Sequence, residues 1–128
     1  MELTPQRPGQ IPGEIGGRQQ IERYGAAGFR VSGIVFHGPV LIFPDHTILW
    51  EAASPTLEGL APFIEAGGIE LILLGLGRRG APVKPDLRAA LKAKGIGIEA
   101  MDTGAACRTY SVLLAEDRLV AAALLLPV

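Results

Sequence analysis

The only cysteine of the chain stands in a polar stretch whose residue types could do chemistry. Residues 101–110 have the sequence MDTGAACRTY. Asp102 or Thr103 is expected to cap a helix that begins here, by accepting a hydrogen bond from a backbone N–H one turn further on. Cys107 would then lie near the positive end of that helix and beside Arg108, and both features lower a thiol pKa. The pattern is compatible with a nucleophilic or redox-sensing thiol.

Two observations favour a buried structural thiol over a reactive one. The two histidines, His37 and His46, come early in the chain, and no spacing places either of them beside Cys107 as a general base. Cysteine is also among the residue types most often buried. His37, Asp45, His46 and Cys107 do not have the spacing of a metal-ligand motif, so we predict no metal site.

A second candidate site is the glycine-rich loop at residues 75–80, GLGRRG, which follows an aliphatic run. It matches the dinucleotide-binding pattern G-x-G-x-x-G, and Glu99 falls near the spacing at which an acid would meet a ribose. That mechanism needs a helix to begin at the glycines, whereas Pro82 and Pro85 delay the next helix. We therefore expect a glycine turn at a strand end and no bound cofactor.

An alternative interpretation combines the glycine-rich loop and the start of the helix after residue 102 in one ligand site. The loop Gly75–Arg79 and the helix start Thr103–Arg108 could hold a small anion or a nucleotide, in a binding domain or an enzyme. This requires the segments to converge at the carboxyl ends of the strands. The candidate contact residues, for an anion or a protein partner, are Gly75, Gly77, Arg78, Arg79, Thr103, Cys107 and Arg108.

The elements that position these residues change in type along the chain. Short apolar runs between residues 29 and 50, separated by glycine and proline, predict strands joined by tight turns. Ser54 followed by Pro55 predicts a helix start, with Pro62 kinking or dividing that helix and Gly67 ending it.

Strands and helices alternate in the second half. We expect strands at residues 69–74 and 96–99, a helix at 85–94 stopped by Gly95, and a final buried strand within 119–126. The helix after Thr103 carries Ala106, Tyr110, Leu113 and Leu114 on one side, so this side should face a sheet. The order predicts an α/β fold with helices packed on a mixed sheet.

Length and composition limit the functional classes. The chain has 128 residues and a formal net charge of −1, so one domain at residues 21–128 and no nucleic-acid partner are expected. Residues 1–20 carry several prolines and glycines and predict a flexible or extended arm. No export signal is visible and the run 119–126 is too short to span a membrane, which favours a cytoplasmic protein without a membrane span.

Several segments carry a family resemblance. Residues 29–33, Trp50, residues 75–77, 101–110 and 116–124 resemble the Mth-type domain family. Its eukaryotic members include an assembly factor for mitochondrial NADH dehydrogenase (respiratory complex I) and an adipogenesis-associated protein.

The resemblance implies a fold and a functional class. The fold is a three-layer α/β domain with a central mixed β-sheet, helices packed on it and an additional N-terminal β layer. The resemblance implies no established catalytic residues. Asp117 stands where the family usually has glycine, so a left-handed backbone is expected there.

The leading hypothesis is a soluble, non-enzymatic protein-binding or assembly factor similar to the complex I assembly factors. It combines the resemblance with the absence of a recognisable catalytic constellation. Its partners would be proteins, such as respiratory or membrane-protein assembly machinery, and a homo-oligomer is also compatible with the sequence. The alternative is the anion- or nucleotide-binding domain described above.

Overall fold

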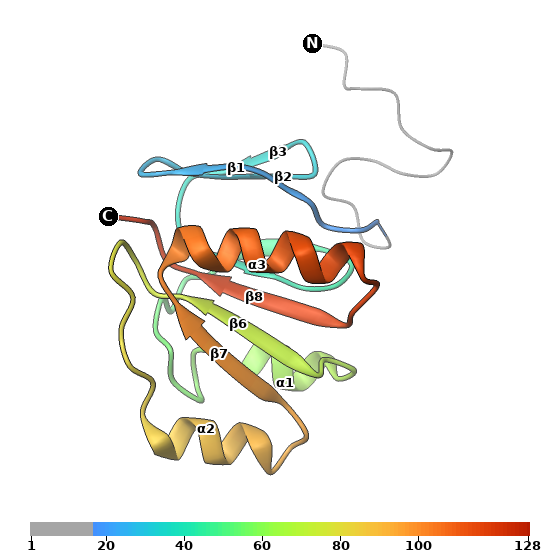
Figure 1. Ribbon diagram of the computed structural model, residues 1–128, viewed down its shortest axis with the longest axis vertical. Coiled ribbons are helices and arrows are strands. Elements are labelled where there is room, and N and C mark those ends of the chain that lie inside the picture. Colours follow the sequence, from blue (N-terminus) through green and yellow to red (C-terminus); the bar gives the residue numbers. More distant parts are fainter. Residues whose placement is uncertain (1–16) are drawn as a thin grey trace.

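Two β-sheets and three helices make up the domain (Figure 1), which a computed structural model describes for residues 17–128. The first 16 residues of the predicted arm lie outside this range. The three-stranded sheet is antiparallel and consists of β1 (Ile21–Gly25), β2 (Gly28–Val31) and β3 (Ile34–Phe36). The helices are α1 (Ala61–Ala66), α2 (Pro85–Lys92) and α3 (Thr103–Ala115).

The five-stranded sheet is mixed. Its order is β5 (Thr47–Leu49), β4 (Val40–Ile42), β8 (Val120–Leu124), β6 (Leu71–Gly75) and β7 (Gly97–Met101). β6 runs parallel to both β7 and β8, whereas β4 runs antiparallel to β5 and β8. The carboxyl ends of β6, β7 and β8 therefore meet at one edge of the sheet, as the two-segment site requires.

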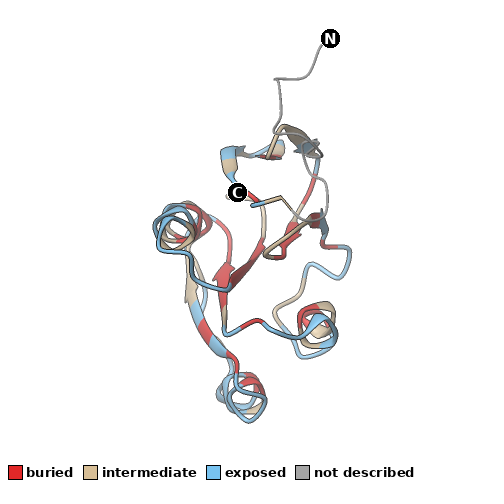
Figure 2. Cartoon of the chain, turned by 90° about the vertical axis from the view of Figure 1, so that its right-hand side faces the viewer, coloured by how far each residue is buried: buried red, intermediate tan, exposed pale blue. Residues whose placement is uncertain are grey.

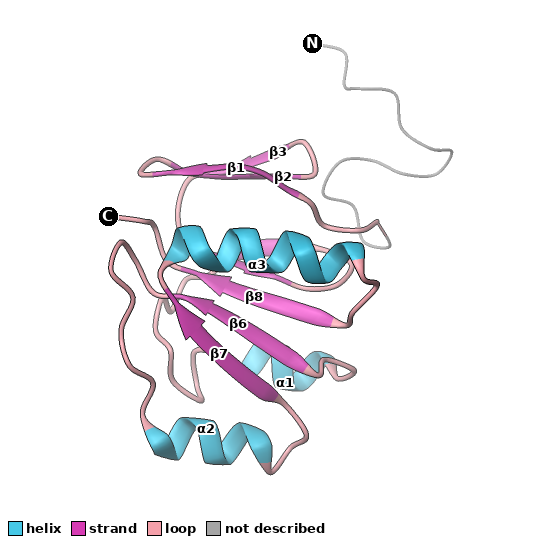
Figure 3. Ribbon diagram, in the orientation of Figure 1, coloured by secondary structure: helices cyan, strands magenta, loops and turns pink. Residues whose placement is uncertain are grey.

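Alternation along the strands divides the core between the two faces of this sheet. On β6, Ile72 and Leu74 pack with residues of α1 and α2, whereas Leu73 packs with α3 and with β2. Figure 3 shows the helices around the strands, and Figure 2 shows buried residues concentrated on the central sheet and on the inward sides of the helices. The predicted three-layer α/β architecture with an additional N-terminal β layer is confirmed.

The predicted helix start at Ser54 is wrong. α1 begins only at Ala61, with Pro62 in its first turn, so this proline helps to start the helix and does not kink it. Before it the chain folds back on itself: a Cβ at Gly59 would lie 2.0 Å from the carbonyl oxygen of Ser54. The Thr56 hydroxyl accepts a hydrogen bond from the Gly59 N–H at 3.0 Å, which holds this turn in place of a longer helix.

Later boundaries follow the sequence more closely. α2 begins at Pro85 as predicted but ends at Lys92, two residues before the predicted end, and Gly95 has the expected left-handed φ of 80°. Asp117 also has the expected left-handed backbone, with φ 58°. β7 continues to Met101, because it pairs with β6 along its whole length, so the predicted strand end at Glu99 is too early.

Residues 17–20, which the sequence places in the arm, are held against the domain. Gln19 is buried, and its side-chain oxygen accepts a hydrogen bond from the Thr47 hydroxyl at 2.8 Å. The Tyr110 hydroxyl donates to the Gln19 carbonyl at 2.7 Å. Because these polar groups satisfy one another inside the protein, this part of the predicted arm belongs to the folded domain.

Candidate functional site

The polar turn at residues 101–110 is a capped helix start, as predicted. Asp102 has an extended backbone, and its side chain accepts a hydrogen bond from the Ala105 N–H at 2.8 Å. Thr103 is the first residue of α3. The cap satisfies one of the N–H groups that a helix leaves unpaired at its N-terminus.

The glycine-rich loop and this helix start converge, but their polar groups bind each other. The Thr103 N–H donates to the Gly77 carbonyl at 2.8 Å, and the Gly77 N–H donates to the Thr103 hydroxyl oxygen at 3.0 Å. The same hydroxyl donates to the Leu125 carbonyl at 2.7 Å. Both segments thus lie at the carboxyl edge of the strands, where these backbone and hydroxyl groups are already paired, whereas Arg78 and Arg79 are exposed. A ligand role for them stays a prediction.

Close packing explains the glycines of the loop. A Cβ at Gly75 would lie 2.8 Å from a methyl carbon of Leu124 and 3.0 Å from the Cα of Thr103. One at Gly80, where φ is 73°, would lie 3.1 Å from the Asp102 nitrogen. The loop needs glycine because it runs directly against the start of α3.

The features expected of a dinucleotide site are missing from this loop. α2 begins at Pro85, so the glycines do not lie at a helix N-terminus. Glu99 lies within β7, where it pairs with Leu73, and its side chain is exposed. The glycine-turn interpretation accounts for the loop without a nucleotide.

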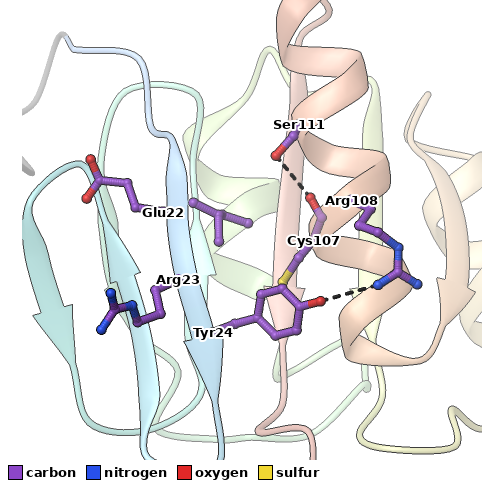
Figure 4. A pocket seen from close by; sticks show the side chains of 7 residues that line it. Glu22, Arg23, Tyr24, Cys107, Arg108 and Ser111 are labelled. Carbon is purple, nitrogen blue, oxygen red and sulfur yellow. Dashed lines mark hydrogen bonds between the residues drawn. The ribbon is translucent and has the colours of Figure 1, made fainter.

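A groove of about 480 Å³ lies between β1 and α3 (Figure 4). Arg108 Nη1 donates to the Tyr24 hydroxyl across it at 3.2 Å, and the Ser111 hydroxyl donates to the Cys107 carbonyl at 3.2 Å. Its lining residues are Ile21, Glu22, Arg23, Tyr24, Cys107, Arg108 and Ser111. Neither Arg78 nor Arg79 is among them, so the structure does not gather the three predicted arginines in this groove.

Burial decides the chemistry of Cys107. The residue is 3% exposed, and burial raises the pKa of its thiol to about 12, against the smaller lowering effect of Arg108. The low pKa that the helix end and the arginine suggest is therefore not reached, since desolvation disfavours the thiolate. At neutral pH the group is a protonated thiol, which is a poor nucleophile.

The histidines do not complete a site around the thiol. His37 is exposed. The His46 ring stacks on the Phe43 ring with 4.3 Å between their centroids, and its Nδ1 lies 2.8 Å from an Asp45 carboxylate oxygen. Within residues 17–128, no group of three His, Cys, Asp or Glu side chains could hold a metal ion. Over the same residues, no helix is long and apolar enough to cross a bilayer.

Sequence reasoning missed the β1 side of the groove. Tyr24 and Arg108 are 84 positions apart, and β1 has no pattern that predicts its packing against α3. Trp50, one of the residues that carry the family resemblance, is buried and donates from its indole N–H to the Gly59 carbonyl at 3.0 Å. It serves the core.

Comparison with known proteins places this geometry in a family. Residues 21–125 match the model of the family described as "Protein of unknown function (DUF498/DUF598)". The chain belongs to this family. The match covers all the strands and helices described above, so both faces of the sheet and the groove are part of the DUF498/DUF598 domain.

Named relatives of this DUF498/DUF598 chain fall into two groups. It is 33% identical over 111 residues to NADH dehydrogenase [ubiquinone] 1 alpha subcomplex assembly factor 3 of Xenopus tropicalis, a match that covers 84% of this chain and 61% of the relative. It is 36% identical over 123 residues to an uncharacterized protein of Rhodobacter capsulatus, covering 96% and 93%. The chain thus spans less than two thirds of the length of the named assembly factor.

A solved structure carries the same fold. The solution structure of a Mth938-like domain from Bordetella pertussis superposes with a TM-score of 0.72 and 27% identity, covering 99% of this chain and 93% of that one. The resemblance to Mth-type domains seen in the sequence is confirmed.

Proposed function

We propose that this chain is a non-enzymatic protein-binding factor that assists the assembly of respiratory complex I. The observation that carries the proposal is the 33% identity, over 84% of the chain, to a protein named as a complex I assembly factor. Since the chain spans only 61% of that relative, the proposed role is the one its family domain can perform.

The chemistry of the groove supports binding in preference to catalysis. The nucleophile predicted from the sequence, Cys107, is buried and protonated at neutral pH, and neither histidine lies among the residues that line the groove. Nucleophilic catalysis by a thiol requires an activated thiolate with a base in hydrogen-bond reach. A protein contact requires neither.

The exposed arginines are the predicted contact residues that remain open to a partner. Arg78 and Arg79 lie on the loop after β6, and Arg108 lies at the groove, all with exposed side chains. Arginine is enriched at protein interfaces, where its planar group pairs with carboxylates. We assign these three residues to the rim of a partner contact. The cytoplasm stays the predicted compartment, because a reducing compartment preserves a free thiol such as that of Cys107.

Removal of the gene from its own organism tests the proposal. We expect assembled complex I to fall on a native gel stained for NADH dehydrogenase activity, while its separate subunits persist. Reintroducing the wild-type gene should restore assembly, and Arg108→Glu should restore it less well although its unfolding temperature is unchanged. An unchanged amount of assembled complex I after gene removal would refute the role.

A further inference from the structure

Strand β5 leaves one edge of the five-stranded sheet open among residues 17–128. The Phe43 N–H donates to the His46 carbonyl at 2.7 Å, and the Trp50 N–H donates to the Pro39 carbonyl at 2.8 Å. In an antiparallel pair the bonded positions alternate, so Ile48 is bonded to β4 and the backbone of Leu49 points away from it. No hydrogen bond from another described residue reaches the Leu49 backbone.

Two of the three side chains of β5 are apolar and exposed, whereas Thr47 is buried. Ile48 is 40% and Leu49 is 48% exposed, and the strand contains no charged residue or proline. Natural proteins usually protect an edge strand with a charged residue or a proline, or cover it with another segment. At the opposite edge, Arg88 Nη1 donates to the Ile98 carbonyl of β7 at 2.7 Å, which occupies one ladder position. Within the part of the chain that the structure describes, no side chain protects the β5 edge in this way.

A groove beside this edge indicates the charge of its occupant. It has a volume of about 620 Å³, and Leu41, Trp50 and Pro62 contribute apolar surface to it. Two carboxylates, those of Glu51 and Glu58, also line it, and none of the described residues in the lining is a lysine or arginine. Complementary charge across an interface favours a basic partner.

The same charges argue against a second copy of the chain. Residues 45–51 of a second copy, DHTILWE, include two carboxylates and no lysine or arginine. Pairing through β5 would therefore bring no lysine or arginine to Glu51 and Glu58, whereas a partner with such residues supplies one.

We propose that the β5 edge binds an extended, apolar segment of a partner protein, which adds a strand to the sheet and pairs its flanking lysine or arginine with Glu51 and Glu58. This mode of recognition takes affinity from main-chain hydrogen bonds and specificity from the side chains. The proposal rests on the protein-binding function above and names the surface and the chemistry of the partner.

A labelled peptide tests the edge directly. The probe is a blocked peptide in which valine and threonine alternate between terminal lysines, and the control peptide carries glutamates in place of the lysines. By fluorescence anisotropy, the lysine peptide should bind the full chain about tenfold more tightly, the ratio that two exposed ion pairs allow. No binding, or equal binding of the two peptides, would overturn the proposal.

Variants of exposed residues distinguish peptide binding at the β5 edge from nonspecific hydrophobic binding. Leu49→Lys should weaken binding of the lysine peptide at least about tenfold, because it charges the edge. Val112→Lys is the matched control, since Val112 is 59% exposed on α3, and it should leave binding unchanged. The pair Glu51→Gln and Glu58→Gln should remove the preference for lysine while thermal unfolding stays as in the wild type.

Other results have defined meanings. Undiminished binding by Leu49→Lys, or self-association of the chain that this change abolishes, would contradict the proposal. If the peptide binds but gene removal leaves complex I intact, the edge stands as a strand-binding site and the respiratory role fails. If complex I is lost but the peptide does not bind, the respiratory role stands and the edge is not the contact.

Discussion

Gly77 and Thr103 hold each other through two hydrogen bonds, at 2.8 and 3.0 Å. One joins their backbones, and the other uses the Thr103 hydroxyl as the acceptor. That hydroxyl also donates to Leu125, so one buried side chain ties the loop after β6, the start of α3 and the chain after β8 together.

Thr103→Val should destabilise the protein by about 2–4 kcal/mol, because it keeps the shape of the side chain but leaves the Gly77 N–H and the Leu125 carbonyl without this partner. Urea unfolding measures the free energy. Thr103→Ser keeps the hydroxyl and should cost about 1 kcal/mol, the loss of one methyl group. Equal costs for the two variants would show that the hydroxyl is not what holds the junction.

Gly75→Ala should destabilise by about 1–3 kcal/mol, because the new methyl group would overlap the closely packed start of α3. Gly97→Ala is the control, since a Cβ there would meet its nearest atoms at an ordinary 3.6 Å. It should change the unfolding free energy by less than about 0.5 kcal/mol. The packing explanation of the loop fails if thermal melts of the two variants coincide.

Cys107 should react slowly with iodoacetamide in the folded protein near neutral pH. Its thiol is buried and protonated, so labelling must wait for local or global opening. Mass spectrometry should find slow modification in buffer and rapid modification in urea. Labelling in buffer at the rate of a free thiol would contradict the burial argument and reopen a catalytic role.

Stability should fall as pH rises from about 9 to 12. The folded thiol has its pKa raised from 9.0 to about 12, so in this window the unfolded chain has lost the proton that the folded chain keeps. Loss of protons from the unfolded state favours unfolding, by up to about 1.4 kcal/mol per pH unit for one group. Below pH 9 both states hold the proton and the effect vanishes.

Cys107→Ala isolates this contribution. Its unfolding free energy should fall less steeply with alkaline pH than that of the wild type, in urea titrations at matched pH values. Burial also raises the pKa of Tyr110, so some slope should persist in the variant. Identical slopes for the two proteins would mean that the thiol is not shielded in the fold.

Tyr110→Phe should cost about 1–3 kcal/mol, because the buried Gln19 carbonyl loses the hydroxyl that donates to it. Hydrogen exchange followed by mass spectrometry should show faster exchange around residues 17–20. Ser111→Ala, which removes an exposed hydroxyl one position further along α3, is the control. Unaltered exchange in Tyr110→Phe would mean that this bond does not anchor the segment.

Local patterns predicted the parts of the fold that local physics determines. The cap at Asp102, the start of α2 at Pro85 and the left-handed backbone at Gly95 all depend on residues within one turn of the chain. The aliphatic run of β6 predicted a strand covered on both faces, since only burial on both sides suits such a run.

Packing contacts that helix and strand patterns do not display decided what was missed. Ser54 and Pro55 form a good helix-start signal, but Gly59 packs on the Ser54 carbonyl and accepts the Trp50 indole N–H, which favours a turn. The electrostatics next to Cys107 predict a lowered pKa, whereas its burial comes from tertiary packing that the sequence does not display. Tertiary context overrides local preference in both cases.

β8 follows all the other described strands in the chain, yet it lies between β4 and β6 in the sheet. During synthesis on the ribosome, the pair β4–β5 and the pair β6–β7 therefore have no common neighbour until β8 emerges. Each half then carries an unpaired inner edge, the kind of surface that aggregates and that chaperones shield. The nascent chain should thus depend on β8 to join these two halves, and a ribosome stalled before β8 would expose both edges at once.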